Sequence, residues 1–279
     1  MKSFEAPGKV NLSLLVSPPR SNGYHPLQSL VQTVAWCDLL DAEVGEGKDE
    51  LESDLEDNLV IRAVEVARKL GKVPPLTLRL RKSLPVAAGL GGGSSDAAAA
   101  LLATSELGEI RVDQLPQAAS RVGADVSLFL TGGTLMMSGI GEEIEEVERA
   151  HGFALAIAVP DFGLSTADVY RRWDEMEGPE GDVVDDRGLP PSLRGRMPMR
   201  NDLLPAAISL DPRLGDFMTD VAAVWGGPVC LTGSGSACFG YFPTLDEAVD
   251  AADAVTSLAR EGRGVALRDR GVSIVQPIT

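Results

Sequence analysis

A glycine-rich segment, residues 82–96, runs directly into an alanine and leucine run at residues 97–102. Four of five consecutive residues in it are glycine, and glycine allows the positive φ angles that bring several N–H groups close to one anion. The apolar run predicts a helix whose peptide dipoles point their positive end at the loop. The segment therefore predicts a phosphate cradle at a helix N-terminus, with Ser94, Ser95 and Asp96 as candidate helix caps.

The two best-known phosphate loops do not fit this segment. A P-loop requires a lysine directly after its glycines, and none stands there. The dinucleotide-binding fingerprint ends on a glycine, where this chain has Ser94. The alternating residues 76–81 predict a strand that ends several residues before the first glycine, whereas a Rossmann turn is tighter. A glycine-rich helix entry without a ligand stays open as the alternative.

The chain has 279 residues, enough for one large domain or two ordinary ones with a full core and no disulfides. Cys37, Cys230 and Cys238 lack metal or disulfide spacing, which indicates reduced thiols that act as small buried hydrophobes. The first residues lack the apolar core of a signal peptide, and no uninterrupted apolar run could span a bilayer. We therefore expect a soluble, cytoplasmic protein with no membrane partner.

Acidic residues strongly outnumber basic ones, and the formal net charge is -16. Nucleic-acid binding needs a basic face that neutralises phosphates, so this class of partner is excluded. A small anionic substrate is not excluded, because backbone N–H groups and one or two local cations can hold a phosphate in an acidic protein. The acidic runs at residues 46–57 and 142–148 indicate solvated surface.

Strand-like and helical patterns alternate along the chain, which predicts a mixed α and β fold. Strands are expected at residues 10–16, 76–81, 134–138, 153–159, 237–242 and near 273–277. Helices are expected at residues 59–70, from the glycine loop to 107, and at 112–122, 214–225 and 245–260. The composition changes near residue 150, which predicts two units, residues 1–150 and 151–279. Residues 178–198, rich in Gly, Pro, Asp and Arg, indicate a surface excursion in the second unit.

Three polar residues in apolar surroundings are candidates for chemistry. Lys9 and Asn11 stand two apart in an expected strand, so both side chains point to one face and can line a polar pocket. An ordinary exposed lysine at a strand start is the alternative. Asp125 is a carboxylate in an apolar stretch, where carboxylates are uncommon unless paired or functional. A helix N-cap after Gly123 is the alternative there, and for Asp96 the cap is favoured.

Two loops add candidate binding groups. Tyr24 and His25 follow a turn, and an aromatic ring beside an imidazole can stack on and hydrogen-bond to a planar base. A surface tyrosine beside a solvated histidine is the alternative. Residues 232–236 form a second Gly-Ser loop, which is a candidate anion nest and also a common turn.

Three segments occur in an order that resembles the motifs of the GHMP small-molecule kinases: residues 7–11, residues 85–95 in the form Pro-x-x-x-Gly-Leu-Gly-Gly-Gly-Ser-Ser, and residues 231–236. Residues 22–25, 123–126 and 200–203 are similar to the branch that phosphorylates a cytidine-diphosphate-linked methylerythritol. The resemblance spans residues 6–240 and implies an α+β fold of two domains. An N-terminal ribosomal-protein-S5-like domain would bind ATP, and a C-terminal ferredoxin-like α/β sandwich would bind the substrate.

The resemblance also implies an activity, the transfer of phosphate from ATP with Mg²⁺ to the 2-hydroxyl of that substrate in the non-mevalonate (MEP) isoprenoid pathway. It assigns no metal ligand. Lys9 and Asp125 would form the catalytic pair, with Asp125 accepting the alcohol proton. Asn58 would lie near the adenine. The residues that would hold the ATP phosphates are Pro85, Val86, Ala87, Ala88, Gly89, Leu90, Gly91, Gly92, Gly93, Ser94 and Ser95.

The same resemblance implies the substrate contacts. Tyr24 and His25 would hold the cytosine, and Tyr170 would close its other face. Asn11 would contact the sugar-alcohol end. Val31 and Pro26 depart from the pattern at the cytosine pocket, and residues 178–198 have no counterpart. The groups that would lie near the substrate diphosphate are Thr166, Gly233, Ser234, Gly235 and Ser236.

Two other functions stay open. A sister kinase that acts on homoserine or mevalonate would keep the glycine loop, but it would have no use for Tyr24 and His25 as a base clamp. A nucleotide-binding regulatory module without catalysis is the second alternative, although it would not need both Lys9 and Asp125. The oligomeric state, monomer or homodimer, stays open as well.

Overall fold

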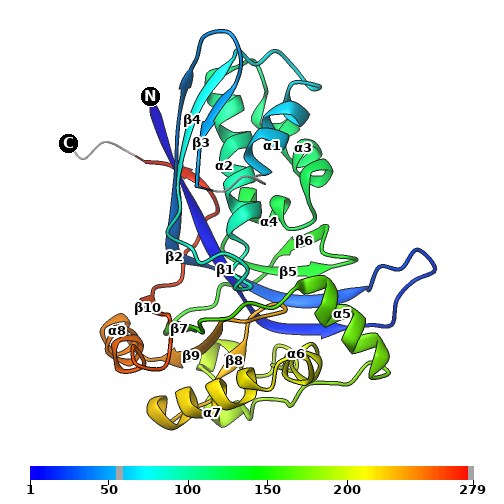
Figure 1. The fold of residues 1–279 in the computed structure, drawn as a ribbon, viewed down its shortest axis with the longest axis vertical. Helices are drawn as coiled ribbons and strands as arrows, with labels where there is room; N and C mark the ends of the chain where they lie inside the picture. Colours follow the sequence, from blue (N-terminus) through cyan, green and yellow to red (C-terminus); the bar gives the residue numbers. More distant parts are fainter. Residues whose placement is uncertain (55–58, 276–279) are drawn as a thin grey trace.

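The computed structural model describes residues 1–54 and 59–275, which form two sheets with helices packed against them (Figure 1). Within these residues the first sheet has seven strands, in the order β11-β1-β2-β4-β3, with β5 pairing with β2 and β6 with β5. Its strands are β1 (Lys2–Val16), β2 (Leu27–Val44), β3 (Glu50–Glu52), β4 (Leu76–Arg81), β5 (Thr134–Ser138), β6 (Glu143–Glu146) and β11 (Ser273–Ile274).

Four α-helices cover one face of the first sheet. They are α1 (Leu59–Ala67), α2 (Gly92–Leu107), α3 (Leu115–Val122, preceded by a 3₁₀ turn at Val112–Gln114) and α4 (Val126–Thr131). In β4 the residues Leu76, Leu78 and Leu80 are buried and alternate with more exposed Thr and Arg, as expected for a strand with one face on the core. The alanine run of α2 lies fully buried against this face, because small side chains let the helix approach the sheet closely.

The second sheet has four antiparallel strands in the order β10-β7-β9-β8, and we call each sheet together with its helices a unit. They are β7 (Ala154–Val159), β8 (Cys230–Leu231), β9 (Cys238–Phe242) and β10 (Glu261–Val265). Alternating small and large residues in β7 divide its two faces: its alanines face helices, and Leu155, Ile157 and Val159 face the first unit. The helices are α5 (Thr166–Glu175), α6 (Leu204–Leu210), α7 (Arg213–Trp225) and α8 (Leu245–Ala254).

The long strands β1 and β2 connect the two units. One core lies between the first sheet and helices α1–α4, and a second forms where β1 and β2 pack against β7 and β9. The glycine-rich segment expected to bind phosphate, residues 82–95, is called the phosphate loop below, and it contributes Leu84, Ala88 and Leu90 to this second core. The loop is therefore held by burial of its own apolar side chains, so its glycines need not be flexible in the folded protein.

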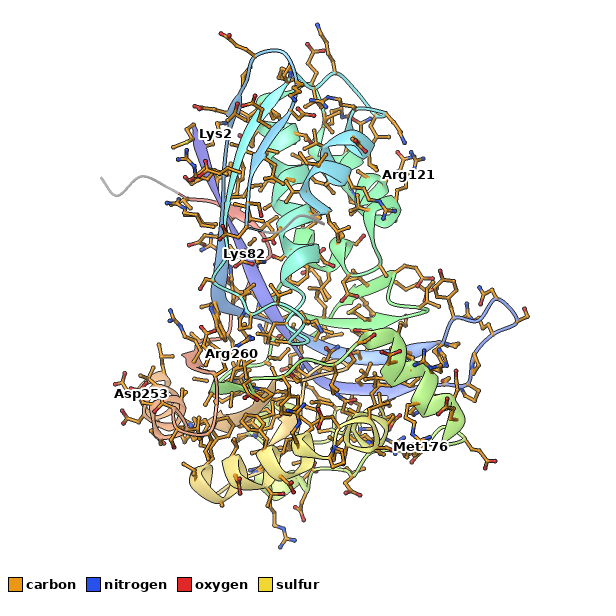
Figure 2. All side chains as sticks on the ribbon, in the orientation of Figure 1. Lys2, Lys82, Arg121, Met176, Asp253 and Arg260 are labelled. Carbon is orange, nitrogen blue, oxygen red and sulfur yellow. The ribbon has the colours of Figure 1, made fainter. Side chains whose placement is uncertain are left out.

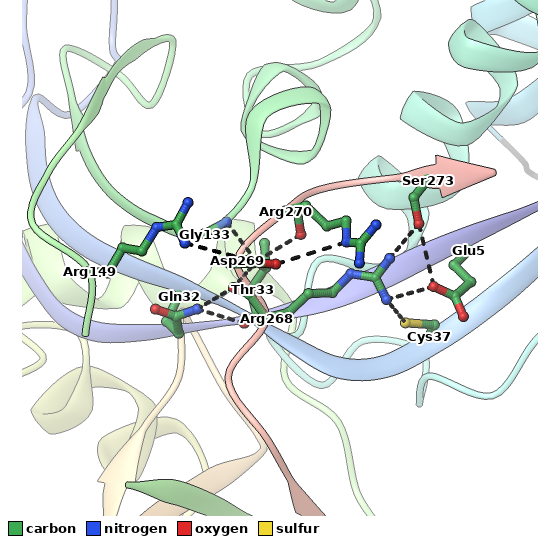
Figure 3. A network of polar contacts seen from close by, with 10 residues as sticks. All are labelled: Glu5, Gln32, Thr33, Cys37, Gly133, Arg149, Arg268, Asp269, Arg270 and Ser273. Carbon is green, nitrogen blue, oxygen red and sulfur yellow. Dashed lines mark hydrogen bonds and ion pairs between the residues drawn. The ribbon is translucent and has the colours of Figure 1, made fainter. Parts of the chain in front are cut away.

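The chain returns to the first unit at its C-terminal end (Figure 3). Phe4 of β1 pairs with Ile274 of β11, and the Gln32 and Thr33 side chains donate to the Arg268 carbonyl. The Arg268 guanidinium forms an ion pair with Glu5 at 2.7 Å and donates to Ser273 Oγ at 2.6 Å. These contacts fasten residues 268–275 across β1 and β2.

Most of the expected elements are confirmed. The strands at 76–81 and 134–138 and the helix to residue 107 have the expected bounds. The strands expected at 153–159 and 237–242 begin one residue later, and the helix expected at 214–225 begins one residue earlier. The helices expected at 59–70 and 245–260 end early, at Ala67 and Ala254, and the one at 112–122 starts as a 3₁₀ turn. The first strand starts earlier, at Lys2, and of the strand near 273–277 only the part up to 275 is described. The hydrophobic pattern missed β2, which alternates irregularly because it is covered on both faces along part of its length.

The expected surface excursion at residues 178–198 is partly wrong. Leu189 and Leu193 are buried in the core shared by the two units, beside 3₁₀ turns at Asp186–Gly188 and Pro191–Leu193. Trp173 Nε1 donates to the Pro179 carbonyl at 2.9 Å at the start of the segment. Its polar composition hid these few apolar anchors, because a short buried contact leaves no periodic signal.

The cysteines agree in part with the expectation of buried, reduced thiols, because Cys238 is buried whereas Cys37 and Cys230 are partly exposed. All three cysteines are free thiols, and burial raises the pKa of Cys37 to about 11 and that of Cys230 to about 12. Among residues 1–54 and 59–275 we find no helix with the length and apolar character of a membrane span.

Candidate active site

A cavity of about 530 Å³ opens where the two units meet. The phosphate loop forms one wall, Lys9 and Asn11 of β1 lie at its base, and Thr166 of α5 and Ser234 come from the second unit. Asp125, directly before α4, completes the wall on the side of the first unit. Five segments far apart in the sequence thus meet at one polar cavity.

The phosphate loop turns into α2 through glycines in the left-handed region. Gly91 is the N-cap of α2 with φ 72°, and no side chain caps the helix. The expectation that Ser94, Ser95 or Asp96 caps α2 is therefore wrong, because the helix begins before these residues. Its first N–H groups are left without side-chain acceptors, which is the arrangement that binds an anion. Gly89 has φ 80°, and a Cβ there would lie 2.2 Å from the Thr232 carbonyl oxygen.

Asp96 is buried inside α2 and binds Lys82, the first residue of the phosphate loop. Lys82 Nζ lies 2.7 Å from Asp96 Oδ2 and also forms an ion pair with Asp38 Oδ2. The other oxygen of Asp38, Oδ1, accepts a hydrogen bond from the Leu84 N–H at 2.7 Å. Figure 2 shows Lys82 in the inner part of the first unit, beside α2. The carboxylate expected to cap α2 instead holds the start of the phosphate loop.

Burial of Asp96 has a consequence for stability. Desolvation raises the pKa of Asp96 to about 7, with Lys82 opposing the rise and Asp38 adding to it. The folded protein therefore keeps a proton that the unfolded chain, with an Asp pKa near 3.8, has already lost. This group stabilises the fold fully below about pH 4, and its contribution is lost as the pH rises to about 7.

We expect Asp96→Asn to remove this pH dependence. The slope of the free energy of unfolding against pH, measured by urea denaturation between about pH 5 and pH 7, should change by roughly 1 kcal/mol per unit. The exposed Asp113→Asn is the matched control and should leave the slope unchanged. An unchanged slope in Asp96→Asn would contradict the buried, proton-binding state of this carboxyl.

Lys9 is a buried cation at the base of the cavity. Its side chain is 5% exposed and donates to Asn11 Oδ1, and Asn11 Nδ2 donates to Ser29 Oγ at 2.7 Å. Burial lowers the pKa of Lys9, and the Asp125 carboxylate partly offsets this. The expected shared face of Lys9 and Asn11 is confirmed, and the alternative of an exposed surface lysine is wrong.

Asp125 stands at the N-cap position of α4, but its side chain makes no capping hydrogen bond. The carboxylate faces the cavity instead. Burial is the main cause that raises the pKa of Tyr170 to about 12, and the negative charge of Asp125 adds to the rise. Lys9, Asp125 and Tyr170 therefore face the same space. A carboxylate and an ammonium group on one cavity wall form an arrangement suited to orienting and deprotonating an alcohol.

The second Gly-Ser loop approaches Lys9 from the other unit. A Cβ on Gly233 would lie 3.3 Å from Lys9 Nζ, and Ser234 Oγ and Thr166 Oγ1 are hydrogen-bonded at 2.8 Å on the cavity wall. Gly235 and Ser236 do not line the cavity, and the Ser236 hydroxyl donates to the Phe162 carbonyl at 2.6 Å. Three of the five residues expected near a diphosphate, Thr166, Gly233 and Ser234, thus line the cavity.

Tyr24 and His25 occupy the loop between β1 and β2 and do not line the cavity themselves. Tyr24 is 59% exposed. The His25 ring contacts that of Tyr170, a cavity residue, with the centroids 5.0 Å apart. The histidine is therefore next to the cavity, whereas the tyrosine projects into solvent.

The other predicted residues divide as follows. Pro85 to Ser94 all line the cavity, but Ser95 is fully buried, and its hydroxyl has no hydrogen-bond partner in the part of the chain that the structure describes. Asn58 lies outside the described residues. Of the two residues that depart from the family pattern, Val31 is fully buried in the first core.

Sequence reasoning missed several residues that shape the site. Ser29 holds Asn11. Asn201 was noted only as part of the motif at residues 200–203, with no role; its Nδ2 donates to the Leu231 and Gly233 carbonyls at 2.9 and 2.8 Å and fixes the second loop. Lys82 was also missed as a residue that shapes the site, although it is the first residue of the glycine-rich segment. A lone lysine shortly before such glycines is a signal that could have found it.

The residues present fit a nucleotide with its magnesium ion. The open N-terminus of α2 can accept phosphates, and the residues at this end, Gly91 to Ser94, all line the cavity. Among the described residues no three His, Cys, Asp or Glu side chains form a metal cage. Mg²⁺ usually keeps several waters and binds through substrate phosphates with one or two carboxylates, so a site of this kind needs no cage built from protein side chains alone.

The fold and this cavity define the chain as a GHMP kinase, and the family model described as GHMP kinases N terminal domain matches residues 58–133. A 4-diphosphocytidyl-2-C-methyl-D-erythritol kinase from Mycolicibacterium gilvum is 37% identical, covering 89% of this chain and 84% of the relative. A 4-diphosphocytidyl-2-C-methyl-D-erythritol kinase from Granulibacter bethesdensis is 36% identical, covering 93% of this chain and 90% of the relative. The chain belongs to the 4-diphosphocytidyl-2-C-methyl-D-erythritol kinase family, and it is an enzyme.

Solved structures agree with this assignment. A crystal structure of 4-(cytidine 5'-diphospho)-2C-methyl-D-erythritol kinase matches with a TM-score of 0.76 at 31% identity, covering 95% of this chain and 98% of that one. A homoserine kinase from Cytophaga hutchinsonii matches with a TM-score of 0.69 at 17% identity, covering 98% of this chain and 97% of that one. At this low identity the match supports the fold alone. The expected two-domain α+β GHMP kinase fold is confirmed.

Proposed function

We propose that this enzyme transfers the γ-phosphoryl group of ATP to the 2-hydroxyl of 4-diphosphocytidyl-2-C-methyl-D-erythritol, giving the 2-phosphate and ADP in the non-mevalonate pathway. The observation that carries the proposal is the meeting of Lys9 and Asp125 with the phosphate loop at one cavity, in a chain 37% identical to a kinase named for this substrate. Residues 1–150 would form the ATP-binding and catalytic domain and 151–279, apart from β11, the substrate-binding domain. Asn11 and His25 of the first domain would add contacts to the acceptor. The three free thiols support a cytoplasmic location.

The cavity residues suggest how the reaction proceeds. The alcohol oxygen forms a bond to the γ-phosphorus, the bond from that phosphorus to the bridging oxygen breaks, and ADP leaves. Asp125 orients the alcohol and accepts its proton, while Lys9 stabilises the negative charge that gathers on the transferring group. Mg²⁺ supplies additional charge neutralisation on the phosphates when it is bound.

The binding groups follow from the same cavity. The N–H groups at the start of α2 would hold the ATP phosphates, with Asn58 near the adenine. Asn11 would bind the acceptor alcohol end, because its side chain is fixed by Lys9 and Ser29. Ser234 and Thr166 would lie near the substrate diphosphate, with the neighbouring glycines, and His25 and Tyr170 near the cytosine, with Tyr24 on the outer side.

Coupled measurement of ADP release tests this function. We expect turnover with 4-diphosphocytidyl-2-C-methyl-D-erythritol and none above background with homoserine or mevalonate. Turnover with homoserine or mevalonate would favour a sister kinase. ATP binding without turnover on any of the three would favour a regulatory module.

A further inference from the structure

His25 is paired with a carboxylate from the other unit of the molecule. Its Nε2 atom lies 2.8 Å from Asp174 Oδ1, although the two residues are 149 positions apart in the sequence. His25 stands just before β2, and Asp174 is in the last turn of α5. The His25 side chain is 9% exposed and that of Asp174 40% exposed, so the pair lies at the edge of the protein interior.

Two aromatic rings of α5 hold the imidazole in place. The ring of Tyr170 is tilted by 42° against it, and that of Trp173 meets it edge-on at 84° with centroids 5.5 Å apart. Trp173 is itself 3% exposed and fixed by its hydrogen bond to the Pro179 carbonyl. The imidazole therefore has a defined plane and little freedom to rotate.

The carboxylate decides which ring nitrogen carries the proton. An ionised Asp accepts hydrogen bonds only, so Nε2 of His25 must be the donor toward Asp174. In a neutral imidazole the other nitrogen, Nδ1, is then an acceptor. Within residues 1–54 and 59–275, Nδ1 has no hydrogen-bond partner.

We propose that Asp174 is a positioning residue that fixes His25 as the Nε2–H tautomer, so that Nδ1 accepts from the amino group of cytosine and the site rejects uracil. Uracil has a carbonyl oxygen where cytosine has its amino group, and two facing acceptors repel each other. This inference rests on the proposed function, which puts the base of the substrate beside His25. It adds a residue that would determine base specificity without touching the substrate.

Competition by nucleotides measures this specificity. Wild-type enzyme should be inhibited by CDP more strongly than by UDP by roughly tenfold or more, the usual effect of an unmade hydrogen bond. Asp174→Asn can donate or accept, so it permits both tautomers, and the CDP preference should shrink to less than about threefold. The KM for ATP should not change. Glu175→Gln, the adjacent carboxylate paired with Arg172, is the matched control and should keep the wild-type preference.

The tautomer can be read directly, because His25 and His151 are the only two histidines of the chain. In ¹⁵N-labelled protein at about pH 8.5, we expect the His25 ring nitrogens to show the Nε2–H pattern, and a mixture in Asp174→Asn. His151→Gln assigns the signals.

Three results would overturn the inference. They are an Nδ1–H tautomer in wild-type protein, an unchanged tautomer in Asp174→Asn, or an unchanged preference for CDP in that variant. If CDP does not inhibit the wild-type enzyme at all, the proposed function fails as well. The tautomer is measured without substrate, so that failure is distinguishable from failure of the role of Asp174 alone.

Discussion

Asp125→Asn should lower kcat by about 10²–10⁴, the usual contribution of a general base, while ATP still binds. The amide keeps the size of the carboxylate but cannot accept the proton of the alcohol. Because Asp125 makes no capping hydrogen bond, the substitution should leave α4 and the stability of the fold nearly intact. Its loss of activity would then report on chemistry and not on folding.

Single-turnover ADP formation and calorimetric titration with ATP separate these effects. Asp113→Asn, an exposed carboxylate paired with Arg111, is the matched control and should retain full activity. Near-normal turnover of Asp125→Asn would exclude this residue from the chemistry. A loss of ATP affinity equal to the loss of kcat/KM would instead assign it to nucleotide binding.

Gly89→Ala should disrupt the phosphate loop and the fold around it. The new Cβ would lie 2.2 Å from the backbone carbonyl of Thr232, which no side-chain rotation can relieve, and φ is 80°. We expect ATP affinity to fall at least tenfold, and the free energy of unfolding to fall by about 2–5 kcal/mol. Calorimetry with ATP and urea denaturation measure the two effects.

Gly152→Ala is the matched control for this substitution. Gly152 has nearly the same φ, 78°, but a Cβ there meets nothing within 4 Å. Gly152→Ala should lower the free energy of unfolding by about 1–2 kcal/mol, because only the left-handed backbone is strained, and it should leave the affinity for ATP unchanged. If both variants lose the same stability and both bind ATP normally, the contact between the phosphate loop and Thr232 does not organise the site.

Local patterns in the sequence predicted the structural features that depend only on residues close together in the chain. The shared face of Lys9 and Asn11 follows from the two-residue period of a strand, and the open helix N-terminus follows from glycines before an alanine run. The role of Asp125 could not be decided in this way. A helix cap and a cavity carboxylate can occupy the same sequence position, directly before a helix. Only the structure shows that the Asp125 side chain makes no capping hydrogen bond.

The pairing of distant groups was also beyond the sequence. Asp96 looked like a cap, but it lies inside α2 because the helix begins at the glycines, and its partner Lys82 comes from another segment. Leu193 looked like part of a surface segment because a single buried anchor has no periodicity. His25 and Asp174 meet only because α5 packs beside the end of β1 and β2.

The sequence by itself determined the glycine-rich loop before a helix, the kinase family and the residue types of the candidate site, since these depend on short motifs whose backbone demands are local. The tertiary structure decided which of those residues share a cavity, which carboxylates bind a cation, and where His25 is held. The physical reason is that burial and charge pairing depend on distances between segments, and those distances exist only once β1 and β2 have joined the two units.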